Sequence, residues 1–255
     1  MSPALALART GRAEWSRIWT VRSSWIFAVA LAVVVVGFGA VIGHDAAGDP
    51  SGVTPGSTAW DGIRFTGMFA LFGLVAMAAV VATADHATGG IVPTLQWTPR
   101  RGLLLTARTA VVAATTTLVG LLSMAAGAVV VWTFVPHLGL PPGDGLALAG
   151  EMGVVLLCGT LLGVGLGLAS RSSAASLVLA IALLLVGPLL LTQLPYQWTL
   201  TTATHLPGSG ALFLIFGEGP SDDMTTTSAR VTMAAWALAA LAAGGWRLLA
   251  TDADR

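Results

Sequence analysis

The chain has 255 residues, of which 55% are hydrophobic and only 9% are charged, and its formal net charge is zero. A soluble domain carries roughly 25% charged residues to solvate its surface, so this composition excludes an ordinary soluble protein and predicts a surface partly covered by lipid. All twelve basic residues are arginine. The absence of lysine excludes a P-loop, whose lysine binds nucleotide phosphates, so any ATPase that drives this protein is another chain.

Residues 1–24 are predicted to form an amphipathic helix that lies along the membrane surface. Trp15, Ile18 and Trp19 are spaced to share one helical face, and Arg17 is among the charged residues placed mostly on the other faces. Indole rings favour the headgroup region of a bilayer, and arginines favour the anionic inner leaflet. The alternative is a mobile basic tail.

Six apolar stretches approach the roughly 20 residues that a helix needs to cross a bilayer. They are residues 25–43, 65–84, 109–132, 146–169, 174–194 and 229–249. The first is interpreted as a retained span and not a cleaved signal peptide, because its apolar run is long and Ala40-Val41-Ile42 is no small-x-small cleavage site. The expected fold class is an all-α integral membrane protein whose six-span domain covers residues 25–255.

The placement of arginine predicts the orientation of these spans. Ten arginines fall on one side of the membrane and two, Arg64 and Arg230, on the other. The ten are Arg9, Arg12, Arg17, Arg22, Arg100, Arg101, Arg108, Arg171, Arg247 and Arg255. Because cytoplasmic loops carry the excess of basic residues, both termini are expected in the cytoplasm. The expected location is the plasma membrane, which the chain crosses several times.

Two features inside the spans concern helix packing. Gly159, Gly163 and Gly167 recur every four residues and therefore share a face on which another backbone can approach closely. That face serves either packing within the chain or a subunit interface. Pro188 is expected to kink the fifth span, because proline removes a backbone donor.

The stretch between the fifth and sixth spans, residues 195–228, is predicted to be an insertion on the outer side. It contains the apolar run Ala211–Phe216, which is far too short to cross a bilayer. A short re-entrant or interfacial helix fits this run, since irregular backbone is tolerated at membrane depth when protein or water surrounds it.

Ionisable groups are scarce in the span interiors, where ion-coupled carriers usually place them. The four histidines show no metal-ligand spacing, and no metal site is predicted. No nucleophile elbow is present around Ser209, and no catalytic residue is predicted.

The loop between the second and third spans, residues 85–102, is longer than a connector needs to be. It mixes apolar side chains, Ile91, Leu95 and Trp97, with polar ones and ends in a proline and two arginines. Such a surface suits insertion into a groove on a cytoplasmic partner.

The loop resembles the cytoplasmic loop of type-2 ABC permeases, the membrane subunits of many bacterial exporters. That pattern is an acid, three residues, glycine, a small residue, an aliphatic residue, threonine-leucine, and proline with arginine. The matching residues, in order, are Asp85, Gly89, Gly90, Ile91, Thr94, Leu95, Pro99, Arg100 and Arg101. The surface helix, the six spans and the outer insertion fit the same family.

The resemblance implies a non-catalytic permease subunit that forms half of the path for a hydrophobic or amphipathic molecule such as a drug, an antibiotic or a lipid-like compound. Its implied partners are two separate ATPase subunits, which carry ATP and magnesium, a second permease and membrane lipid, but no nucleic acid. The loop 85–102, including Trp97, is the implied coupling interface. The alternative is an ATP-independent membrane protein: a facilitator, a sensor partner or an intramembrane enzyme.

Overall fold

The protein is an all-helical bundle. The computed structural model describes residues 3–87 and 101–250, and this part of the chain contains helices and no strand. Six of the helices described there are long and apolar enough to span a membrane. They are Arg22–Gly48, Gly67–Asp85, Arg101–Phe134, Pro142–Ser170, Ser173–Thr192 and Thr226–Ala250. The prediction of a multi-pass helical membrane protein is thereby confirmed.

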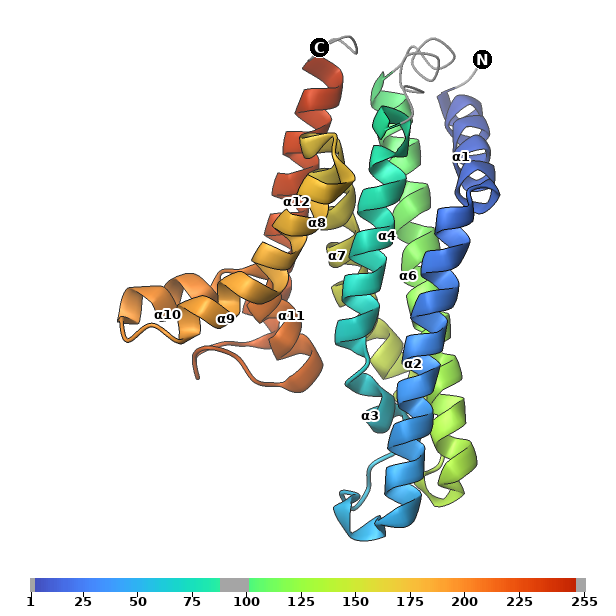
Figure 1. Ribbon diagram of the computed structural model, residues 1–255, viewed down its shortest axis with the longest axis vertical. Coiled ribbons are helices and arrows are strands. Elements are labelled where there is room, and N and C mark those ends of the chain that lie inside the picture. Colours follow the sequence, from blue (N-terminus) through green and yellow to red (C-terminus); the bar gives the residue numbers. More distant parts are fainter. Residues whose placement is uncertain (1–2, 88–100, 251–255) are drawn as a thin grey trace.

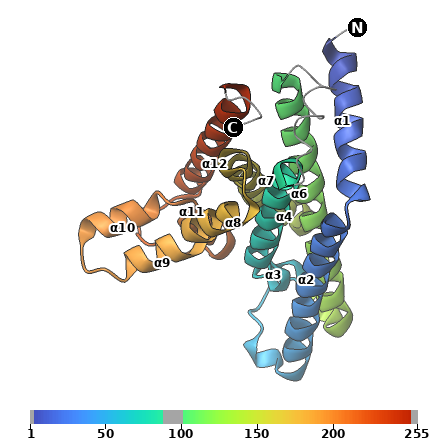
Figure 2. The same cartoon turned by 45° about the horizontal axis from the view of Figure 1, so that its top comes forward.

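Both termini lie at one end of the bundle, which we call the terminal end (Figure 1). Helix α1 (Pro3–Thr20) lies there and is followed after one residue by α2 (Arg22–Gly48). Val21 between them has an extended backbone, which ends the first helix and lets the second begin in a new direction. A turn of the view shows α1 at greater length (Figure 2), so its axis is inclined to that of α2.

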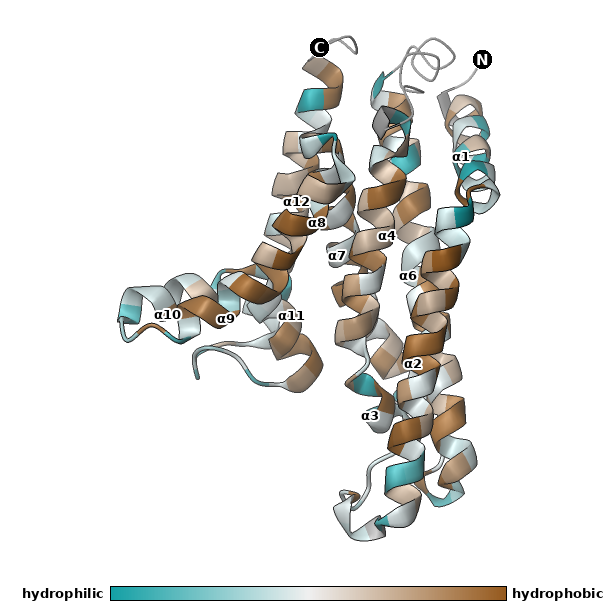
Figure 3. Ribbon diagram, viewed as in Figure 1, coloured by the Kyte–Doolittle hydropathy of each residue, from teal (hydrophilic) through white to brown (hydrophobic). Residues whose placement is uncertain are grey.

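Helix α7 (Pro142–Ser170) is the centre of the bundle. It packs against α4 (Gly67–Ala87), α6 (Arg101–Phe134) and α12 (Thr226–Ala250). Large apolar side chains on the outside of the bundle stay exposed, among them Val33, Val178 and Leu238. Apolar residues cover most of the length of the long helices, whereas polar residues gather on α1 and near the ends (Figure 3). This distribution is what a lipid-covered bundle requires.

At the end opposite the terminal end, Arg64 links the short helix α3 (Ala59–Arg64) to α7 and α11 (Pro207–Phe216). Helix α3 begins with a capping box between Thr58 and Asp61. From its last residue, the Arg64 guanidinium donates to the carbonyl oxygen of Ile215 at 2.9 Å and pairs with Glu151 on α7. Two further turns, the 3-10 helices η1 (Pro50–Gly52) and η2 (Pro136–Leu138), also lie outside the long helices.

The fifth span is not a single straight helix. It consists of α8 (Ser173–Ile181), one π-helical segment η3 (Ala182–Val186) and α9 (Gly187–Thr192). Pro188 is the second residue after the π-helical segment, and its missing amide hydrogen removes one backbone bond there. The helix type therefore changes just before the proline at which a kink is predicted. Such π-helical turns commonly accompany bends in helices. The kink itself stays a prediction.

Two short helices follow before the last span: α10 (Gln197–Thr204) and α11 (Pro207–Phe216). The apolar run expected at 211–216 is the second half of α11, which is ten residues long and too short to cross a bilayer. Helices α9 and α10 project to one side of the bundle (Figures 1 and 2). The re-entrant position of this segment stays a prediction.

Candidate functional site

Four charged side chains meet at the terminal end of the bundle. Arg108 on α6 donates through Nε and Nη2 to the two carboxylate oxygens of Glu14 on α1, each at 3.2 Å. The same Nη2 donates to Oδ2 of Asp85, near the end of α4, at 2.5 Å. Arg17, also on α1, pairs with Asp85 and lies 3.3 Å from Glu14. Two acids and two arginines thus form one balanced network, which we call the charge cluster.

The local structure explains how the members of the charge cluster meet. Glu14 and Arg17 are three residues apart on α1, so they share one helical face. The guanidinium group of arginine is planar and carries five donors, which lets Arg108 serve two carboxylates at once. A lysine at this position would offer a point charge without that fork.

The charge cluster is largely removed from water. Arg108 is 1% exposed, Glu14 5% and Asp85 9%. An ion buried without a partner is penalised by several kcal/mol, so each of these groups depends on the others for its charge to be tolerated. Burial, together with the nearby Arg108, holds the pKa of Arg17 below its ordinary value. The Nη1 atom of Arg108 is buried and has no hydrogen-bond partner.

The charge cluster ties the end of α4 to two other helices, and α4 leads into the loop 88–100. At the far end of that loop, Nη1 of Arg101 donates to the carbonyl oxygen of Leu248 on α12 at 3.2 Å. Both ends of the loop are therefore attached by arginines to the bundle.

The predicted coupling interface is only partly placed. Of its ten residues, Asp85 and Arg101 lie in the described part of the chain. The remaining eight, Gly89, Gly90, Ile91, Thr94, Leu95, Trp97, Pro99 and Arg100, lie outside the described residues. Asp85 pairs with Arg17 and Arg108 inside the chain, so its carboxylate has an intramolecular role at this position.

The predicted surface-helix residues divide between two environments. Ile18 is 2% exposed and belongs to an apolar cluster with Met77 and Val81 of α4. Trp15 is 48% exposed, and its ring meets that of Trp19 edge to face at a centroid distance of 5.9 Å. A helix is present over Pro3–Thr20 of the predicted range 1–24, but Ile18 and Trp15 do not share one exposed face. The location of α1 on a membrane surface stays a prediction.

The glycine face of α7 packs within the chain. A Cβ atom added at Gly159 would lie 2.1 Å from Leu71, and one at Gly163 would lie 2.7 Å from the carbonyl oxygen of Val75. At Gly167 it would meet Ala82 at 2.9 Å. These three glycines therefore let α7 approach α4 closely. Of the two alternatives, this geometry corresponds to helix packing within the chain and not to a subunit interface.

An open apolar groove lies between α4 and α8. Its volume is about 450 Å³, and its walls include Phe72 and Ala76 on α4 and Leu177 and Ile181 on α8. All the residues that line it are apolar, so it suits a hydrocarbon surface better than a charged molecule.

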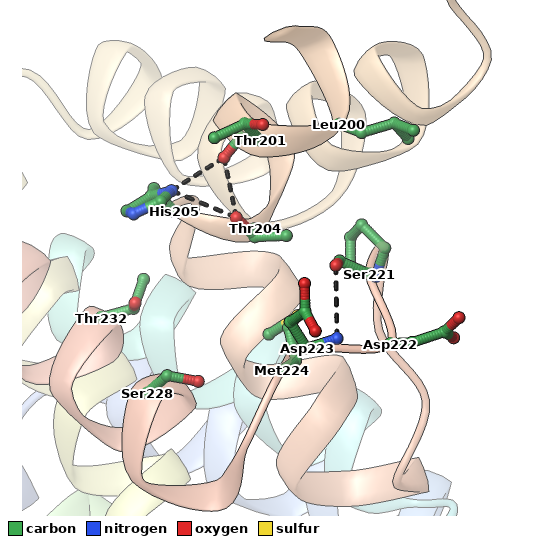
Figure 4. Close-up of a pocket in the computed structure, with 11 residues that line it drawn as sticks. Leu200, Thr201, Thr204, His205, Ser221, Asp222, Asp223, Met224, Ser228 and Thr232 are labelled. Atoms are coloured by element: carbon green, nitrogen blue, oxygen red, sulfur yellow. Dashed lines mark hydrogen bonds between the residues drawn. The ribbon is translucent and has the colours of Figure 1, made fainter. Parts of the chain in front are cut away.

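A second cavity, of about 540 Å³, lies between α10, α12 and the chain that follows α11 (Figure 4). In it, the ring of His205 lies beside Thr201 and Thr204, and Nδ1 is 2.8 Å from the carbonyl oxygen of Thr201. Asp222 and Asp223 come from the loop before α12. Within the described residues, no three His, Cys, Asp or Glu side chains gather to hold a metal.

Comparison with protein-family models and with curated proteins found no match for the chain.

Two members of the charge cluster escaped the prediction from sequence. The sequence pattern does not single out Glu14, and Arg108 directly precedes the third predicted span, which begins at residue 109. Helix α6 begins at Arg101, so Arg108 lies seven residues inside the helix. An arginine that interrupts an apolar helix near its end is the one signal in the sequence that indicates a buried acidic partner.

Proposed function

We propose that this chain is the permease subunit of an ATP-driven ABC exporter, with its terminal end in the cytoplasm. It would form half of the translocation path, and a second permease would form the other half. Two ATPase subunits on separate chains would bind at the terminal end, on its cytoplasmic side, and supply ATP and magnesium. The loop that begins near Asp85 would be their contact with this chain.

The charge cluster is the observation that supports this proposal most directly. A coupling loop must pass a partner's motion to the spans, and a loosely attached loop would lose that motion. Asp85 is linked through Arg17 and Arg108 to α1 and α6, and Arg101 is linked to α12. Because buried arginine-carboxylate pairs resist separation, a displaced loop would move these helices as well.

The cargo class follows from the groove between α4 and α8. Its lining has no charged group, and a strongly anionic cargo would be expected to meet basic residues along its path. The cargo would therefore be hydrophobic or amphipathic. The outer insertion, α10 and α11, would close the outer end of the path as a re-entrant segment.

Substitution of the loop tests the coupling. Leu95→Asp or Trp97→Asp should abolish stimulation of export by ATP while the chain still inserts into the membrane, because the loop lies outside the hydrocarbon. The ATP-dependent efflux of a set of lipophilic dyes from inverted membrane vesicles, compared with membrane insertion on an immunoblot, measures both effects. Thr54→Asp, which adds the same charge at an exposed position between α2 and α3, is the control and should leave ATP-dependent efflux unchanged.

Two results would count against the proposal. If Leu95→Asp and Trp97→Asp leave ATP-dependent efflux at the level of the unchanged chain, then the loop is not the coupling element. If efflux proceeds equally without ATP, then the chain is an ATP-independent facilitator.

A further inference from the structure

A small cavity lies at the junction of α1, α2 and α4, beside the charge cluster. Its volume is about 270 Å³. Val80 and Val81 of α4 give it an apolar wall, and Ser23 and Ser24 of α2 give it a polar one. The cavity is therefore amphipathic, and it lies where a membrane span begins.

The polar wall is the N-terminus of α2, a helix of 27 residues. The first amides of a helix have no acceptor within it, and together they carry about half a positive elementary charge. The residue before the helix, Val21, has no side chain able to cap them. The amides of Arg22 and Ser23 thus lie at an uncapped helix start beside the cavity.

Ser24 supplies an independent indication of a ligand. Its side chain is 1% exposed and lines the cavity, and its hydroxyl oxygen has no hydrogen-bond partner. A serine three residues into a helix ordinarily bonds to a nearby backbone group or to water. This buried hydroxyl has no partner and lies beside an uncapped helix start. It is therefore available to donate a hydrogen bond to an acceptor group in the cavity.

The charges around the cavity favour an anion. Asp85 and Arg17 both line it, but Asp85 is already paired with Arg17 and with Arg108. The four members of the charge cluster therefore sum to zero. What remains at the cavity is the positive end of α2. Arg22, the exposed first residue of that helix, does not line the cavity.

We propose that this cavity binds the phosphate group of an anionic phospholipid. The amides at the start of α2 and the Ser24 hydroxyl donate to the phosphate oxygens, as helix N-termini do to phosphates generally. Val80 and Val81 contact the first carbons of an acyl chain that continues down the outside of α4. The inference requires only that α2 and α4 span a membrane, and it does not depend on export or on an ATPase.

Lipid binding to the purified full-length chain tests this proposal. Native mass spectrometry would be used with phosphatidylglycerol, with phosphatidylcholine of the same acyl chains, and with sodium phosphate. We expect phosphatidylglycerol to bind about tenfold more tightly than phosphatidylcholine, because the site selects net negative charge at a helix N-terminus. Inorganic phosphate, which lacks the acyl chain, should not displace the lipid at equal concentration.

Ser23→Asp is the most informative variant. An acidic residue in the first turn stabilises a helix, so this change should leave the fold intact while repelling the phosphate. We expect phosphatidylglycerol to bind about tenfold more weakly, since a like charge lies at the anion site. Ser173→Asp, in the first turn of α8 and outside the cavity, is the matched control and should bind the lipid as the unchanged chain does.

Ser24→Ala provides a second variant, because it removes the hydroxyl and adds no volume. Loss of one donor should weaken phosphatidylglycerol about threefold. Equal binding of both lipids, or unchanged affinity in Ser23→Asp and Ser24→Ala, would overturn the proposal. Displacement by equimolar inorganic phosphate would overturn the lipid assignment, because the cavity would then be a site for free phosphate.

Discussion

At the scale of single residues, Arg108 has the most demanding environment in the described part of the chain. It is the largest of the side chains that are almost fully buried, and it contacts two carboxylates that come from different helices. The stability of the terminal end therefore depends on one guanidinium group. Removing it would leave Glu14 and Asp85 with Arg17 as their remaining partner.

Arg108→Leu is expected to destabilise the bundle by about 3 kcal/mol, because removing one partner strands buried charge of the opposite sign. Thermal unfolding of the purified chain in detergent measures the loss. Arg230→Leu, which alters an exposed arginine on α12, serves as the control and should change stability little. Unfolding of Arg108→Leu at the temperature of the unchanged chain would show that the cluster contributes nothing.

The contacts within the charge cluster could not be predicted from the sequence. Glu14 and Arg108 are 94 positions apart, and no local pattern connects them. Asp85 was identified because it opens a motif, but its two arginine partners are a consequence of how α1, α4 and α6 pack. Charges at the ends of apolar stretches are ordinarily expected to face water, so their burial is visible only in three dimensions.

At the scale of the helices, the long apolar runs predicted the six long helices, but some of these helices extend beyond the apolar runs. Helix α6 begins at Arg101, eight residues before position 109, where the predicted third span starts. The apolar pattern stops at a charge, whereas the helix continues because Arg108 finds partners inside the bundle. The change of helix type before Pro188 could be predicted only as a kink, since proline in the sequence does not specify how the backbone adjusts.

The closeness of α7 to α12 leads to a second prediction. A Cβ atom at Gly165 would lie 2.4 Å from the backbone of Ala240, whereas one at Gly150, on the same helix, would meet nothing within 4 Å. Gly165→Ala should therefore destabilise the chain by about 2 kcal/mol through overpacking. Gly150→Ala should stabilise it by up to about 1 kcal/mol, because alanine favours helix.

Thermal unfolding in detergent distinguishes these two variants. They carry the same substitution in the same helix, so a difference between them reports the contact with α12 and not helix propensity. Equal unfolding temperatures for Gly165→Ala and Gly150→Ala would contradict the close packing of α7 and α12.

At the scale of the whole molecule, composition and span count were enough to predict a multi-pass helical bundle. They were not enough to predict that α7 lies at its centre, because the hydropathy of α7 lies between those of the most and least apolar spans and only packing distinguishes an inner helix from an outer one. The placement of both termini at one end agrees with an even number of spans. Which side of the membrane that end faces is a separate prediction based on arginine.

The single cysteine makes the orientation straightforward to test. Cys158 is buried, so Cys158→Ala provides a background in which one new cysteine can be labelled. With a maleimide that cannot cross membranes, Asp222→Cys should react in intact cells. Arg12→Cys, also at an exposed position, should react only after the cells are opened. The reverse pattern would show that the terminal end faces outward.

Affinity purification of the tagged chain, from its native membranes in mild detergent, tests whether a separate ATPase supplies the energy for this bundle. We expect a P-loop ATPase to copurify in equal amount with the unchanged chain and to be retained after washing. This expectation would be contradicted if the chain is recovered intact, from membranes that contain such ATPases, with none bound.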